Sequence, residues 1–172
     1  MGIRDEELKR LEAYAKALGV QKVMYSTKPS NNGAEWHTDG SQITLYVTKR
    51  LTKTALILNF IHELGHASHW INVGKKDHPD LITALNAEDA RKANDPPIDK
   101  KLRKLIYYDE FAGTQYWDKI IKTVDIKINL EKINISKKID LYIYRTYYET
   151  GNLPTRKELI SFKKRLKNES KK

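Results

Sequence analysis

The segment from residue 52 to residue 73 constrains the fold more than any other, because it predicts a long helix that is apolar nearly all round. Thr52 or Thr54 can cap its first turn, and Gly74 follows its end as a typical stop. The apolar character is strongest over residues 55–61. A helix of this kind should lie buried at the centre of the fold.

Before this central helix, the sequence predicts one helix and a small sheet. An amphipathic helix is expected over residues 4–18, with acidic residues in its first turn and Gly19 after its end. Asp39-Gly40 is typical of a tight turn and would join two of the strands as a hairpin. The expected strands are Gln21–Thr27, Ala34–Thr38 and Gln42–Thr48.

After the central helix, the sequence favours further helices. One is expected over Asp80–Lys92, and the break at residues 94–97 contains two prolines. The next helix should begin near Ile98 and continue through residues 109–121. The isoleucine-rich residues 123–140 alternate as a strand would, but no turn residue precedes them, so helix or irregular packing is favoured.

Residues 61–67 read IHELGHA and contain the pattern HExxH. On a helix, His62 and His66 lie one above the other on one face, so both imidazoles can reach a single ion. Glu63 can then reach a water on that ion, where a general base is needed. Because the chain has no cysteine, the ligands must be His, Asp or Glu, and one zinc ion per chain is expected. Gly65 would let another backbone or the substrate approach closely.

A catalytic zinc needs a third protein ligand and keeps one position for water. Position 72, ten residues after the first histidine, is Asn, so the metzincin pattern is absent. His69 returns to the same helical face, but three ligands on one straight helix cannot surround an ion, so it should lie in the core or behind the ligands. His78 precedes a proline in a loop and is expected in solvent. The remaining candidates are Asp109 and Glu110.

These two acids lie in a stretch of Tyr, Phe and Trp, where burying an unpaired carboxylate is costly and a metal would supply a partner. The following residues, Ala112 and Gly113, would let this second helix pack closely on the central one. Helical facing favours Glu110 as the ligand, with Asp109 exposed or behind the ligands, and the reverse assignment stays open.

A helix, a short sheet with a hairpin, a helix bearing HELGH and a later helix bearing Glu resemble the gluzincins. The similarity covers roughly residues 4–118, and the small size suggests the minigluzincin type, or the related HELGH peptidases encoded near phage and mobile-element repressors. It implies a zinc endopeptidase in which His62, His66 and Glu110 bind the metal and Glu63 is the base.

The resemblance also implies that the strand at 42–48, or its hairpin neighbour, offers an edge to an extended protein or peptide substrate. One departure concerns the residues after the expected glutamate ligand. The family commonly has Ala and then Asp or Asn three and four positions later, whereas this chain has Gly113 and Thr114. A side chain that would orient a ligand histidine is therefore missing from its usual place.

The formal net charge of +10 is concentrated in the last third of the chain. Residues 119–172 carry 15 Lys and Arg against 6 Asp and Glu, whereas residues 1–118 carry 17 against 16. Thr155 and Glu158 form a capping box that opens a basic amphipathic helix there. The alternative function is a nucleic-acid-associated or host-factor-binding regulatory protein with a structural zinc. A codon bias toward Lys would also produce this excess of positive charge, and that explanation is favoured over a binding surface.

The sequence as a whole predicts an α+β fold: an N-terminal helix, a small sheet with antiparallel pairing, two ligand-bearing helices and a mostly helical basic C-terminal region. We expect a single domain over residues 1–172, with its core at 4–118 and an extension at 119–172. Residues 1–16 lack the apolar core of a signal peptide, and no segment is long enough to span a bilayer. The expected location is the cytoplasm, or the host cytoplasm if the protein is phage-encoded.

Overall fold

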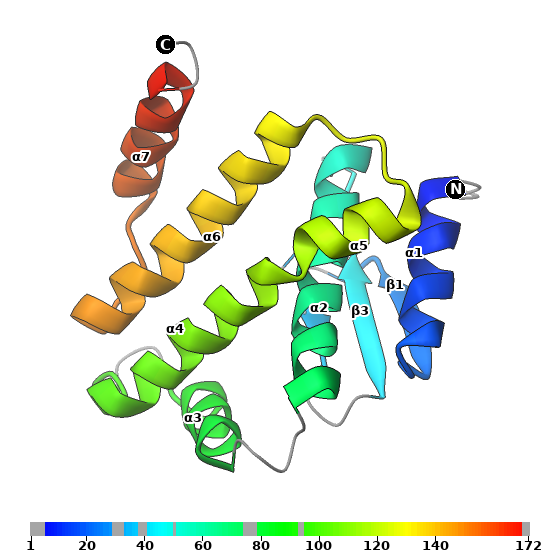
Figure 1. Cartoon of the computed structure of the whole chain (residues 1–172). Coiled ribbons are helices and arrows are strands. Elements are labelled where there is room, and N and C mark those ends of the chain that lie inside the picture. The colour runs from blue at the N-terminus through cyan, green and yellow to red at the C-terminus, as the bar shows by residue number, and fades with distance from the viewer. Residues whose placement is uncertain are drawn as a thin grey trace. The chain divides into compact units, whose positions relative to one another are not determined.

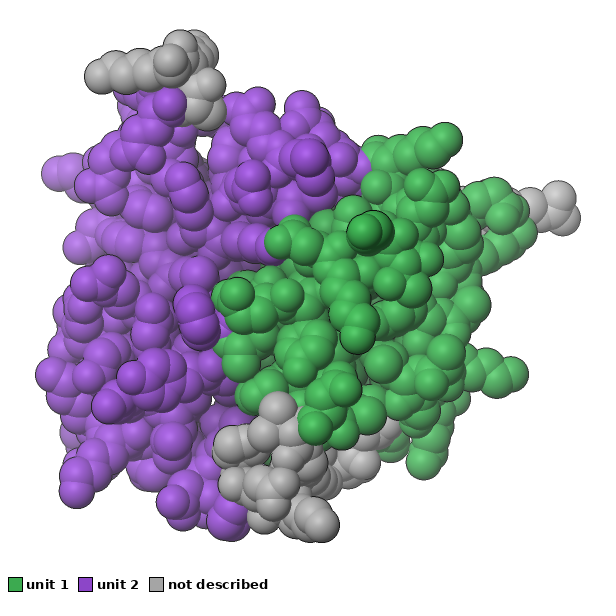
Figure 2. Space-filling view, viewed as in Figure 1, with its two compact units in different colours: residues 1–75, 112–127 green, residues 76–111, 128–172 purple. Residues whose placement is uncertain are grey.

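The computed structural model describes residues 6–28, 33–37, 41–49, 51–73, 79–92 and 95–169 (Figure 1). The chain forms two compact units, each assembled from two stretches (Figure 2). Unit 1 comprises residues 1–75 and 112–127, and unit 2 comprises residues 76–111 and 128–172. Organisation as one domain, with a core at 4–118 and an extension at 119–172, stays a prediction.

Unit 1 contains a three-stranded sheet with helices packed on it. The strands are β1 (Lys22–Ser26), β2 (Ala34–Trp36) and β3 (Gln42–Tyr46), in the order β1-β3-β2. β2 pairs with β3 in antiparallel register, so the predicted pairing is confirmed, while the Asp39-Gly40 turn lies outside the described residues. β1 pairs with β3 in parallel, which local sequence signals did not indicate. The α+β fold class is confirmed.

The helices of unit 1 are α1 (Glu6–Ala17), α2 (Lys53–Val73) and α5 (Trp117–Val124). α2 contacts α1, β2, β3 and α5, so the predicted central helix is confirmed within this unit. Thr52, rather than Thr54, caps it, because the Thr52 hydroxyl accepts a hydrogen bond from the Ala55 amide at 3.2 Å. On α2, the side chains of Phe60, Ile61 and Leu64 are completely buried.

Unit 2 contains α3 (Pro79–Asp89), α6 (Leu130–Thr150), α7 (Arg156–Glu169) and most of α4 (Lys100–Gln115). α4 continues across the division, and its last turn, from Ala112, belongs to unit 1. Ala84, Ile106 and Tyr147 form a buried cluster in unit 2.

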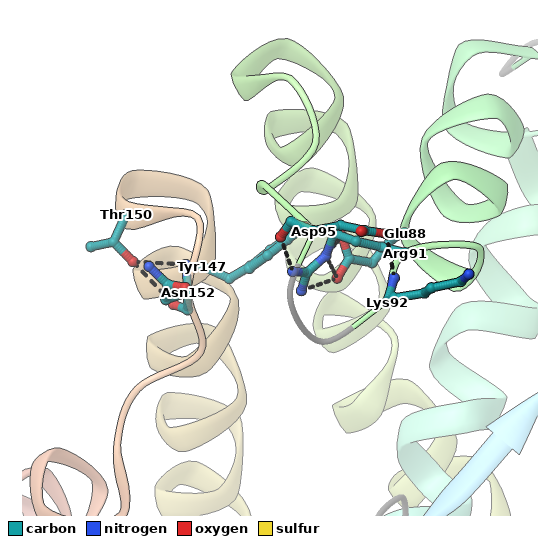
Figure 3. A network of polar contacts seen from close by, with 7 residues as sticks. All are labelled: Glu88, Arg91, Lys92, Asp95, Tyr147, Thr150 and Asn152. Atoms are coloured by element: carbon teal, nitrogen blue, oxygen red, sulfur yellow. Dashed lines mark hydrogen bonds and ion pairs between the residues drawn. The ribbon is translucent and has the colours of Figure 1, made fainter.

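A hydrogen-bond network fastens α6 to α3 within unit 2 (Figure 3). The Tyr147 hydroxyl donates to the Glu88 carboxylate, which also pairs with Arg91 at 2.9 Å. Burial, followed by the hydrogen bond to Glu88, raises the pKa of Tyr147 well above its ordinary value. The phenol therefore stays protonated and remains a donor over the whole physiological pH range.

The predicted helix from Ile98 through Ile121 is in fact two helices. α4 ends at Gln115, where the Tyr116 amide bonds to the Gly113 carbonyl three residues back, and α5 begins at Trp117. No Gly or Pro lies at residues 114–117, so the sequence did not indicate a break there. α5 ends at Val124, its C-cap Asp125 adopts a left-handed conformation (φ 53°), and the Asn129 side chain caps α6. Residues 123–124 thus close α5, residues 125–129 are irregular and residues 130–140 belong to α6, so the expectation of helix or irregular packing is confirmed.

The capping box at the start of α7 is present as predicted. The Thr155 amide donates to a Glu158 carboxylate oxygen at 2.7 Å, and the Glu158 amide donates to the Thr155 hydroxyl at 3.3 Å. In the parts of the chain described above, no helix has both the length and the apolar character needed to cross a bilayer.

Candidate metal centre

The two histidines of the HExxH pattern face each other on α2. Their Nε2 atoms lie 3.2 Å apart, and their ring centroids are separated by 4.8 Å with an interplanar angle of 68°. His62 is half-buried and His66 is 8% exposed. The helical spacing therefore brings both donor atoms to one point, as the sequence predicted.

Glu110, on α4, joins the two histidines in a group that can hold a metal ion. One ligand atom from each residue lies within 4.8 Å of the other two. Glu110 is 7% exposed, so its carboxylate is withdrawn from bulk solvent. Among the described residues this is the cluster of His, Asp and Glu with metal-binding spacing, and it contains the three ligands predicted from the sequence.

The distances suit a small divalent cation. Two imidazole nitrogens at about 2.0–2.1 Å from a tetrahedral zinc lie about 3.3–3.4 Å apart, and the observed separation is 3.2 Å. Two neutral rings that share one N–H···N hydrogen bond would lie at the same distance. The 4.8 Å limit is wider than a tetrahedral shell, so the Glu110 carboxylate must turn inward to complete one.

Two glycines bring α4 close to α2 at the histidines. A Cβ atom at Gly65 would lie 2.5 Å from the Gly113 carbonyl oxygen and 3.1 Å from the Trp117 Nε1. A Cβ atom at Gly113 would lie 3.3 Å from the His66 Nδ1. The predicted close packing is confirmed, and it places the Gly113 backbone against the edge of the His66 ring that faces away from His62.

Trp117 was not predicted as part of this site. Its ring packs edge-to-face on His62, with centroids 5.9 Å apart at 78°, and its side chain is 1% exposed. The Trp117 indole nitrogen has no hydrogen-bond partner among the described residues. This contact was only weakly indicated by the sequence. Trp117 follows Glu110 by seven residues, which would place both on one face of a continuous helix, but the helix breaks at Tyr116.

Glu63 and Asp109 are both buried. Each is 7% exposed, and Glu63 directly follows the first histidine on α2. The sequence left open whether Asp109 is exposed or lies behind the ligands, and in the structure it is not exposed. Asp109 is not in the metal-binding group, in agreement with the choice of Glu110.

The other candidate residues have different surroundings. His69 is outside the metal-binding group and lies 6.4 Å, centroid to centroid, from Tyr116. His78 lies outside the described residues. On the hairpin, Trp36 packs edge-to-face on Trp70 with centroids 5.3 Å apart, and His37 is exposed.

The strand order narrows the choice of substrate edge. β3 lies between β1 and β2, so it has no open side within the described sheet. Its hairpin neighbour β2 is an edge strand. Of the two strands suggested by the resemblance, only β2 could therefore accept an added strand.

Comparison with models of known protein families, with curated proteins and with solved structures gives no match. The case for a function therefore depends on the residues of the site themselves.

Proposed function

We propose that this chain is a zinc-dependent metallopeptidase that hydrolyses peptide bonds in an extended segment of a protein substrate. The observation that carries the proposal is the meeting of His62, His66 and Glu110, from two helices, beside the buried Glu63. The three ligand residues leave room for water in a four-coordinate shell. A bound zinc would supply a Lewis acid that polarises the peptide carbonyl and acidifies a water.

The protein's own residues would manage the proton and hold the ligands. The Glu63 carboxylate takes a proton from the attacking water and afterwards delivers it to the leaving amine. Trp117 and the Gly113 backbone limit the ring positions of His62 and His66, which keeps the donor atoms aimed at one point. The edge strand β2 is the proposed place for the substrate backbone.

The donor set alone would also suit ferrous iron, since two His and one carboxylate form the facial triad of some iron enzymes. Glu63 favours the hydrolytic alternative, because a buried carboxylate one residue after a ligand matches the need for a base. Elemental analysis of protein purified without added metal separates the two. We expect about one zinc per chain, retained in His69→Ala and lost in His66→Ala.

Catalysis is tested with the Glu63→Gln variant. It should retain zinc but lose hydrolysis of fluorescently labelled casein, an unfolded protein used as a general probe. Glu6→Gln, on the exposed side of α1, is the matched control and should behave as the wild type. If Glu63→Gln cleaves the probe as well as the wild type, or if His66→Ala keeps its metal, the proposal is wrong.

A further inference from the structure

α7 carries a strongly basic surface that the metal site does not use. Its 14 residues include six Lys and Arg but only two Glu. One side of α7 packs on α6: Leu166 is 5% exposed, and the Phe162 ring stacks on Tyr142 with centroids 4.0 Å apart. Packing thus accounts for the apolar side of α7 and leaves the basic side exposed.

The cations follow two adjacent rows along the exposed side. Arg156, Lys163 and Lys167 recur at intervals of seven and four residues, and Lys157 and Lys164 run beside them at an interval of seven. All five are exposed. With a rise of about 1.5 Å per residue, the longer row extends for about 16 Å. We call these five residues the basic face of α7.

The two acids of α7 point elsewhere. Glu158 is turned about 100° from Lys157 and is held in the capping box by Thr155. Glu169 lines a hollow between α6 and α7, together with Glu131 and Lys138. Five of the six cations of α7 therefore share one side, while the sixth, Arg165, lies over the Phe162 ring, 5.0 Å from its centroid, on the side of the two acids.

The positions of Arg156 and Lys157 argue against a purely structural role. Basic residues stabilise the C-terminal end of a helix, but these two lie in its first turn, where the helix dipole disfavours them. Their placement reduces helix stability slightly. Favourable interaction with a negatively charged partner would offset that effect.

We infer that the basic face of α7 binds the phosphate backbone of double-stranded nucleic acid. Two rows of exposed cations match a partner with phosphates along both edges of a groove, and such contacts need no base recognition. An anionic membrane suits the face less well, because a surface helix needs a broad apolar side, and between the two rows of cations only Ile160 is apolar. A single strand suits it less well too, since Phe162 is already stacked on Tyr142 and cannot stack on bases.

The test measures binding of the full chain to a labelled 20-base-pair DNA duplex of arbitrary sequence by fluorescence anisotropy. If about four phosphates are neutralised, the logarithm of the association constant should fall with the logarithm of salt concentration with a slope of about −3 to −4. The double variant Lys163→Gln/Lys164→Gln removes two contacts. It should make the slope shallower by about 2 and weaken binding at least about tenfold at 0.1 M salt.

The matched control is Lys16→Gln/Lys22→Gln, which removes the same charge from exposed positions of unit 1. It should change affinity by less than about twofold. Circular dichroism checks that both double variants keep the wild-type helix content. The inference is wrong if the wild type does not bind the duplex, if the two double variants lose affinity equally, or if vesicles containing phosphatidylserine bind the chain and DNA does not. It is independent of the metal site, so Glu63→Gln should bind DNA as the wild type does.

Discussion

The close approach of Gly65 to Gly113 predicts that Gly65→Ala destabilises the protein, whereas Gly→Ala inside a helix usually stabilises it. In an ordinary helix interior, Gly→Ala stabilises by about 1 kcal/mol, because Ala restricts the unfolded chain and favours the helix. At Gly65, the added Cβ would lie 2.5 Å from the Gly113 carbonyl oxygen, and real Cβ contacts stay beyond 3.0 Å. The α4 backbone would therefore have to move by at least 0.5 Å.

The expected size of the effect follows from those two terms. Overpacking a buried contact costs about 1–3 kcal/mol, and the upper part of this range applies because a backbone carbonyl cannot rotate aside as a side chain can. After subtracting the helix-propensity gain, Gly65→Ala should lower the free energy of unfolding by about 1–2 kcal/mol. For a chain of this length, that corresponds to a fall of about 2–8 °C in Tm.

Gly113→Ala is the matched comparison, since it is also a buried glycine in a helix. Its Cβ would contact the His66 ring at 3.3–3.4 Å, and a ring can give way by a few tenths of an ångström. We expect its stability to stay within about 1 kcal/mol of the wild type, but its zinc affinity to fall because a ligand ring is displaced.

Urea unfolding followed by tryptophan fluorescence suits both variants, because Trp36, Trp70 and Trp117 all belong to unit 1. A Gly65→Ala protein that is as stable as the wild type, or more stable, would refute the described approach of the two helices.

Three further predictions concern unit 2. Thr155→Ala removes the α7 cap and should cost about 1 kcal/mol of stability, seen as a lower midpoint in thermal circular dichroism; an unchanged midpoint would contradict it. Hydrogen bonds from the Thr155 side chain, and then from its backbone, lower the pKa of Glu158. The capping box therefore stabilises α7 fully at pH values above the ordinary carboxyl pKa, and this stabilisation is lost as the pH falls through the lowered pKa of Glu158. Glu158→Gln should abolish this pH dependence in a helicity titration, and an unaltered titration would rule out the box as its source. Tyr147→Phe deletes the hydrogen bond to Glu88 and should destabilise by about 1–3 kcal/mol in urea, with zinc content unchanged; wild-type stability would show that the network adds nothing.

Local patterns were enough to predict most helices and the approach of His62 and His66 to one point. The apolar periodicity of α2, the capping box of α7 and the spacing of His62 and His66 each depend on neighbours within a few residues. Glu110 required one tertiary argument, that a buried acid beside small residues implies close helix packing, and the glycine contacts confirm that packing.

The features that sequence reasoning missed depend on distant contacts. β1 pairs in parallel with β3, although β2 lies between them in the sequence, and the local pattern of neither strand indicates this pairing. The break at Tyr116 involves no residue with a turn preference, and Asp125, a residue type that tolerates the left-handed conformation, was not recognised as the end of a helix. The contact of Trp117 with His62 depends on that break, so it could not be anticipated.

The coordination of the metal tests the central claim most directly, and X-ray absorption at the zinc edge of the zinc-loaded full chain measures it. Two imidazole nitrogens at about 2.0–2.1 Å, with oxygen ligands completing a four-coordinate shell, are the predicted result. In His66→Ala this signature should disappear. A spectrum with three imidazoles, or one of hydrated zinc without any, would contradict the assignment of His62, His66 and Glu110 as the ligands.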